Sequence, residues 1–176
     1  MNKLEKFNRH QIKVVSDAAA LAEEIVSNFY KMSQSQWINR RYDIKTLKDL
    51  EDEEIVDGPF AQIIKYHGKK EDTVLGSSMY DFYKICIQDN SIISILRQKP
   101  EIKLPPFILY IITHELIHIL RFGKFYQNFD ASYFEKMEEE TRVHAKTREI
   151  IKTVTLSGLK DVLIFYKKWG RPFMRS

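Results

Sequence analysis

The sequence predicts an α+β domain that is mainly helical and contains a small antiparallel sheet. Segments with apolar residues at helical spacing outnumber the extended ones, and two runs of β-branched and aromatic residues are separated by a polar loop that contains glycine. The chain has 176 residues, of which 44% are hydrophobic and 12% aromatic, so it is long enough for one core and too apolar for a disordered protein. We therefore expect a single domain over residues 1–176.

The first half of the chain is predicted to contain a long helix, a short helix and the two strands. Residues 10–31 carry an apolar stripe at helical spacing, and charged residues alternate with leucine over residues 46–55, as is typical of a short surface helix. The runs at residues 60–67 and 79–88 have strand patterns and are expected to pair antiparallel. Residues 91–98 fit a helix or a strand equally well.

The second half is predicted to be helical throughout. Residues 107–122 are apolar nearly all round and follow two prolines that favour helix entry, so this helix is expected to be buried. A second long helix is predicted over residues 132–154, with Ser132 as its N-cap and Glu135 three residues later as capping-box partner. A last helix is predicted over residues 159–169.

Composition excludes several classes of protein. The single cysteine, Cys86, excludes a disulfide framework and a zinc cluster built from cysteines. Neither a membrane-spanning apolar run nor a signal-peptide pattern is found, so we expect a cytoplasmic protein without a membrane partner. Residues 141–176 carry nine basic and two acidic groups, a surplus that more often marks a solvated face than a nucleic-acid site, so nucleic acid is not the partner we expect.

Residues 114–118 read HELIH and form an H-E-x-x-H motif. Successive residues of an α-helix are about 100° apart, so His114 and His118 leave the same face, one turn from each other, as two ligands of a tetrahedral zinc ion require. Glu115 lies beside that face, where it can take a proton from a zinc-bound water. The alternative is a pair of hydrogen-bonded core histidines with Glu115 in solvent.

A third ligand is expected from the helix at residues 132–154. Its helical wheel places Glu140 in the centre of the buried stripe with His144 one turn further, whereas Glu139 falls at the edge of the stripe and Glu138 nearly opposite. An inward glutamate needs a cation, which could be zinc or the guanidinium of Arg121. For His144 three roles stay open: third ligand in place of Glu140, hydrogen-bond partner of a ligand, or stabiliser of a developing oxyanion.

The two helices resemble the active-site helix and the backing helix of zincin metallopeptidases, in particular of the gluzincin branch. In that branch a glutamate ligand follows H-E-x-x-H by about twenty residues, often with a polar residue four positions later; here Glu140 follows His118 by 22 residues and His144 stands four positions later. The segments HELIHILRF and EEETRVHAKT also resemble a group of small, uncharacterised bacterial zinc peptidases. The resemblance covers residues 105–150. It departs from large gluzincins in having histidine where they often carry aspartate, and in lacking their extra subdomains.

The resemblance implies a zincin-like fold in which His114, His118 and Glu140 bind Zn²⁺ and Glu115 is the general base and acid. It also implies that the strand at residues 79–88 is the sheet edge on which an extended peptide lies. We therefore expect a zinc metallopeptidase, a hydrolase of peptide or protein substrates.

A hypothesis of a different class is a non-enzymatic, metal-stabilised module that binds a partner or nucleic acid through the basic C-terminal region. A closed site with His144 as a fourth ligand would support this module, whereas an open coordination position would support the enzyme, in which His144 assists catalysis.

Overall fold

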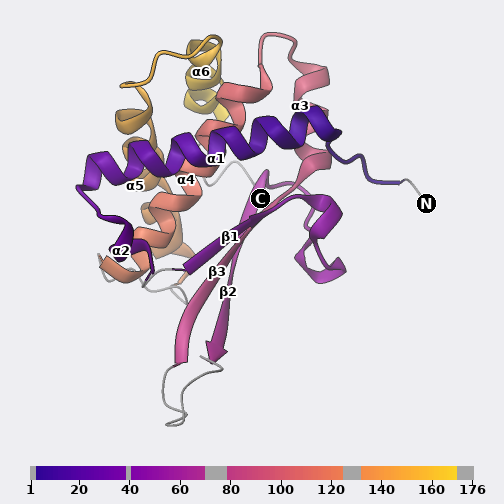
Figure 1. The fold of residues 1–176 in the computed structure, drawn as a ribbon. Helices are drawn as coiled ribbons and strands as arrows, with labels where there is room; N and C mark the ends of the chain where they lie inside the picture. The colour runs from indigo at the N-terminus through magenta and orange to yellow at the C-terminus, as the bar shows by residue number, and fades with distance from the viewer. Residues whose placement is uncertain (1–2, 39–40, 70–78, 125–131, 170–176) are drawn as a thin grey trace.

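The structure is a computed structural model that describes residues 3–38, 41–69, 79–124 and 132–169 (Figure 1). Within these residues the fold is mixed α/β and mostly helical, with six α-helices and a three-stranded sheet, in agreement with the predicted class. In chain order the elements are α1 (Arg9–Tyr30), α2 (Gln34–Ile38), β1 (Arg41–Lys45), two short 3-10 turns (Leu47–Asp49 and Asp52–Glu54), β2 (Ala61–Lys69), β3 (Met79–Ile87), α3 (Asp89–Gln98), α4 (Leu104–Lys124), α5 (Tyr133–Ile151) and α6 (Leu159–Trp169).

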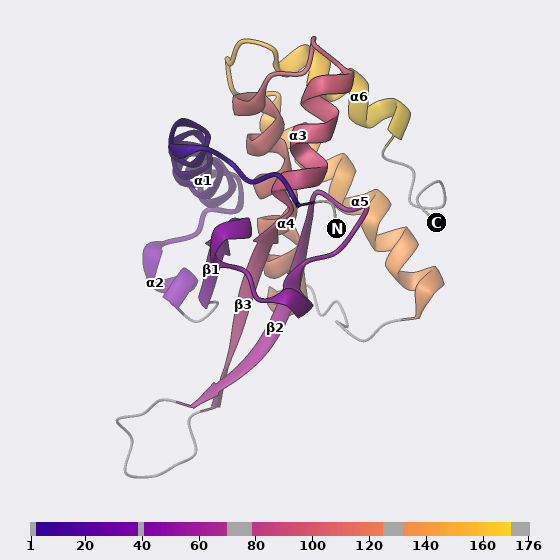
Figure 2. The same ribbon diagram turned by 90° about the vertical axis from the view of Figure 1, so that its right-hand side faces the viewer.

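The sheet has the strand order β1-β3-β2, with β3 in the centre (Figure 2). Strands β2 and β3 pair antiparallel, with Ala61 opposite Ile87, which confirms the predicted pair. Strand β1 pairs parallel with β3, with Arg41 opposite Phe82, so the sheet is mixed and the prediction of a purely antiparallel sheet was wrong. The expectation that residues 79–88 form an edge was also wrong, because β3 pairs with β1 on one side and with β2 on the other. The two edge strands of the sheet are therefore β1 and β2.

The segment between β1 and β2 is not the surface helix that its charge pattern predicted. It forms two 3-10 turns because side chains from elsewhere bind its backbone. The Asp89 carboxylate accepts a hydrogen bond from the Leu47 amide at 3.0 Å, and the Gln88 amide nitrogen donates to the Glu54 carbonyl at 3.0 Å. These long-range bonds replace the ladder of an α-helix, and the periodicity of the sequence does not reveal them.

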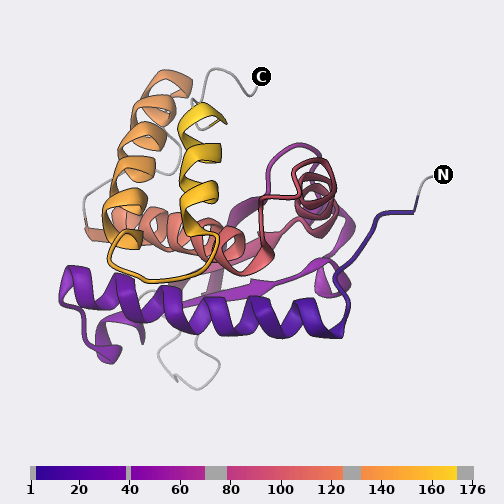
Figure 3. The ribbon, with the colours of Figure 1, turned by 90° about the horizontal axis from the view of Figure 1, so that it is seen from above.

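Helix α4 forms the centre of the core, as its all-round apolar sequence predicted. It lies between α1 on one side and the pair α5 and α6 on the other (Figure 3). Its fully buried side chains include Phe107, Leu109, Tyr110, Leu116 and Leu120. Within the described residues, no helix combines the length and the apolar content that a membrane crossing needs.

Helices α5 and α6 are joined by residues 152–158, and both helices pack against α4. The Ser132 hydroxyl caps α5 by accepting a hydrogen bond from the Glu135 amide at 3.3 Å, as predicted, although α5 ends at Ile151, earlier than expected. Gly158 has φ +85° before α6, and a Cβ at this position would lie 3.3 Å from side-chain carbons of Lys103 and Pro106. The positive φ therefore favours glycine here, and a Cβ would also crowd side chains at the start of α4.

Candidate metal centre

Helices α4 and α5 bring three potential metal ligands together. His114 and His118 project from one face of α4, and Glu140 faces them from α5. The Nε2 atom of His114 lies 2.8 Å from Glu140 Oε1, and Nε2 of His118 lies 2.9 Å from Glu140 Oε2. One donor atom from each of the three residues lies within 4.8 Å of the other two. This buried group could hold a metal ion.

The three donors open onto a cavity of about 240 Å³. Their side chains are only 10%, 11% and 20% exposed, so the donors are largely shielded but not sealed off. One wall of the cavity comes from the segment that enters β2, the edge strand. The lining residues are Pro59, Phe60, Ala61, Ile111, His114, Glu115, His118, Glu140, His144 and Tyr166.

The carboxylate of Glu140 is the negative centre of the cluster. Burial raises its pKa, but the positive charge of the nearby His114 and hydrogen bonds from His118 and His144 outweigh burial and hold the pKa well below 4.5. For His114, burial lowers the pKa, whereas the charge of Glu140 and a hydrogen bond with Glu115 raise it to about 10. Without a metal ion, the site thus pairs the ionised Glu140 carboxylate with a protonated His114, and a metal cation would take the place of the His114 proton.

The surroundings of His114 fit a metal ligand. Within the described residues, its buried Nε2 atom makes no hydrogen bond of acceptable geometry, although Glu140 Oε1 is 2.8 Å away. Its other nitrogen, Nδ1, lies 3.1 Å from Glu115 Oε1. Carboxylates thus face both nitrogens, and without a metal ion His114 is protonated; loss of the Nε2 proton on metal binding would leave Nδ1–H on Glu115 and a lone pair on Nε2. Two imidazole nitrogens and a carboxylate oxygen form a donor set that suits zinc.

The glutamates of the EEE run take different roles in the structure. Glu139 is 4% exposed and accepts a hydrogen bond from Arg121 Nε at 2.7 Å, so it is Glu139 that forms the ion pair considered for Glu140. Glu138 is exposed, and its Oε2 atom lies 3.8 Å from Nη2 of Arg142. Glu140 is directed at the histidines, as the helical wheel indicated.

His144 lies beside the donor group rather than within it. Its Nε2 atom is 3.2 Å from Glu140 Oε1, and its ring centroid is 4.3 Å from that of His114. Its Nδ1 atom lies 2.8 Å from the hydroxyl of Tyr110, a contact that sequence reasoning missed. Tyr110 stands one turn before His114, but in a helix that is apolar all round this spacing looks like any other core position.

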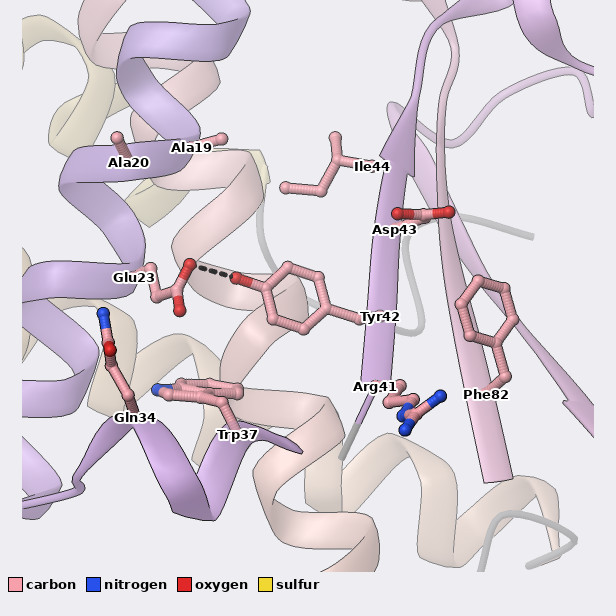
Figure 4. A pocket seen from close by; sticks show the side chains of 10 residues that line it. All are labelled: Ala19, Ala20, Glu23, Gln34, Trp37, Arg41, Tyr42, Asp43, Ile44 and Phe82. Carbon is pink, nitrogen blue, oxygen red and sulfur yellow. Dashed lines mark hydrogen bonds between the residues drawn. The ribbon is translucent and has the colours of Figure 1, made fainter. Parts of the chain in front are cut away.

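A second cavity of about 690 Å³ lies between α1, α2 and β1 (Figure 4). Tyr42 extends across it from β1 and donates a hydrogen bond to Glu23 Oε2 at 2.6 Å. Its ten lining residues include no histidine, so this cavity lacks the donors of the candidate centre.

The chain matches no protein-family model, and comparisons with curated proteins and with solved structures find no similar protein. The assignment of function therefore depends on the site.

Proposed function

We propose that the protein is a zinc-dependent peptidase of the gluzincin type. In this proposal His114, His118 and Glu140 bind the zinc ion, and Glu115 is the general base and acid of peptide-bond hydrolysis. Metal binding at this site and hydrolysis are two separate parts of the proposal, and each has its own test below.

One observation carries the proposal: the H-E-x-x-H histidines and a glutamate from a second helix meet at a cavity whose wall also contains Glu115. The two helices are separate in sequence, and Glu140 reaches both histidines through different carboxylate oxygens at 2.8 and 2.9 Å. A pair of core histidines with Glu115 in solvent is a poorer fit, because Glu115 is 8% exposed and lines the cavity.

In this proposal the residues around the cavity take the other roles in hydrolysis. Bound zinc would supply Lewis-acid chemistry, which polarises a carbonyl and acidifies water. The Glu115 carboxylate, which lines the cavity, would take up a proton from water and release it to the leaving amine. An extended peptide would lie along β2 instead of β3, because β2 is an edge strand and Phe60 and Ala61, at its start, line the cavity.

The alternative is a non-enzymatic module stabilised by a metal, in which His144 would be a fourth ligand. Its Nε2 atom is close enough to Glu140 for the histidine to be considered as a fourth ligand that closes the site. The partner of such a module would bind through the basic C-terminal region.

Two measurements test the proposed function. Elemental analysis of protein purified without chelators should find one zinc ion per chain; protein without any transition metal would refute metal binding. Glu115→Gln should keep zinc and fold but lose activity on a mixed peptide library by about 10²–10⁴-fold, because the proton carrier is gone while the ligands remain. The matched control is Glu138→Gln, which changes an exposed carboxylate on α5 to an amide. Equal cleavage by wild type and Glu115→Gln would refute the peptidase, and salt-dependent partner binding would then test the module.

A further inference from the structure

A buried chain of hydrogen-bonding groups runs from the core of α4 to the candidate metal centre. The Tyr110 hydroxyl lies 2.8 Å from His144 Nδ1, and His144 Nε2 lies 3.2 Å from Glu140 Oε1. Tyr110 is fully buried and His144 is 3% exposed. The chain therefore links a core tyrosine to a proposed zinc ligand through the two nitrogens of one imidazole.

The groups at the two ends of this chain differ in what they can do. An ionised carboxylate only accepts hydrogen bonds, whereas a tyrosine hydroxyl can donate one. A neutral His144 satisfies both contacts when Tyr110 donates to Nδ1 and the proton of the imidazole is on Nε2, facing Glu140. His114 differs from His144 because carboxylates face both of its nitrogens, Glu115 at Nδ1 and Glu140 at Nε2, so that its Nε2 becomes a donor to the metal only when the Nε2 proton is released.

We propose that Tyr110 is a positioning residue that holds His144 as an N–H donor to Glu140, so that His144 is not a zinc ligand. The inference rests on the proposed function, since it assumes that Glu140 binds the metal. It makes the protein donors three in number and leaves a coordination position for substrate and water, which favours the enzyme over the closed module.

Two further observations support this assignment. The group of donor atoms that lie within 4.8 Å of one another consists of His114, His118 and Glu140 and does not include His144. His144 and Glu140 are also one turn apart on the same helix, so their contact is set within α5 and does not depend on how α4 and α5 pack.

Ring packing fixes the positions of Tyr110 and His144. The ring of Tyr110 stacks on that of Tyr166 from α6, with centroids 3.8 Å apart and planes 15° apart, and on His144 at 5.9 Å and 26°. Removal of the Tyr110 hydroxyl therefore keeps both stacked ring faces and removes the hydrogen bond to His144 Nδ1. Hydrogen-bond partners of ligands typically contribute 10- to 100-fold to metal affinity.

The test measures Co²⁺ and Zn²⁺ affinity by competition with a chelator, together with the visible absorption of bound Co²⁺. Tyr110→Phe should lower the affinity about 10-fold without changing the shape of the Co²⁺ spectrum. His144→Gln should stay near wild type, since its amide N–H can replace Nε2–H, whereas His144→Ala should lose about 10- to 100-fold. The matched control is Tyr42→Phe, which removes another hydroxyl with a short hydrogen bond, away from the metal centre.

The outcomes separate this inference from the proposed function. Wild-type protein that binds neither ion overturns both. Tight binding in wild type with unchanged affinity in Tyr110→Phe overturns the inference alone, as does a His144→Gln protein whose Co²⁺ spectrum shows a changed coordination number. If Tyr110→Phe is too unstable to purify, ¹⁵N NMR of the imidazoles in zinc-loaded wild type decides: protonated Nε2 on His144 supports the inference, and metal-bound Nε2 overturns it.

Discussion

The contribution of Glu54 to the free energy of unfolding can be calculated approximately from the structure. It is 2% exposed, and its carboxylate accepts hydrogen bonds from Lys84 Nζ at 2.7 Å, the Tyr66 hydroxyl at 2.7 Å and the Glu51 amide at 2.8 Å. Burial raises the pKa of Glu54, but these bonds and the charge of Lys84 outweigh burial and lower the pKa from 4.5 to about 2. Glu54 thereby holds the segment before β2, which includes the cavity-lining residue Phe60, against the sheet.

The lowered pKa of Glu54 means that its ionised carboxylate stabilises the folded protein. At about 1.4 kcal/mol per pH unit, the difference between 4.5 and about 2 corresponds to about 3 kcal/mol of unfolding free energy. Because the pKa is lower in the folded protein than in the unfolded chain, this stabilisation is present above pH 4.5 and is lost as the pH falls towards 2. Glu54→Gln should therefore cost about 3 kcal/mol at neutral pH, or about 6–12 °C in Tm for a chain of this length.

Urea unfolding followed by circular dichroism, at neutral pH and at steps between about pH 5 and 2, measures both effects. The unfolding free energy of Glu54→Gln should fall less steeply than that of wild type as the pH decreases, so that the two curves of free energy against pH converge at the lowest pH. Glu53→Gln, at an exposed neighbour, is the matched control and should behave as wild type. Parallel curves for wild type and Glu54→Gln would refute the reasoning, as would an equal loss in Glu53→Gln.

Two more predictions follow from α5 and the turn after it. Glu140→Gln should weaken zinc binding, measured by chelator competition, more than Glu139→Gln does, because Glu140 faces the histidines while Glu139 binds Arg121; a larger effect from Glu139→Gln would reassign the ligand. Gly158→Ala should lower the unfolding free energy by about 1–3 kcal/mol in urea titrations, because alanine is strained at φ +85° and its Cβ would crowd Lys103; an unchanged midpoint would show that the turn can relax.

The sequence could predict the parts of the fold that depend on local patterns. Apolar periodicity located α1, α4 and α6 within a few residues, because an amphipathic or fully apolar helix has the same signature wherever it packs. Strand β1 was not predicted: its five residues alternate between charged and apolar, as in a strand, but the run is short, and it becomes a strand by pairing with β3, which is distant in sequence. The 3-10 turns near Glu54 were missed for the same reason, since their backbone is bound by side chains such as Asp89 and Gln88.

In the candidate site, too, the sequence predicts what is local to one helix better than what depends on the packing of two helices. His114, Glu115 and His118 are related by spacing within one helix, so the sequence could define their geometry. Glu140 could be assigned because a helical wheel gives the direction of a side chain, even though the crossing of α4 and α5 is not encoded locally.

The role of His144 could not be derived from the sequence, because it depends on the group that faces its second nitrogen. That group is the hydroxyl of Tyr110, on a different helix and 34 residues away. The ring of Tyr110 in turn stacks on the ring of Tyr166 from α6. An imidazole beside a metal ligand can be a ligand or an N–H donor, and the choice is made by its other neighbour. If Tyr110 donates to Nδ1 as we propose, the hydrogen bond between α4 and α5 keeps His144 as an N–H donor to Glu140 and leaves the candidate site open.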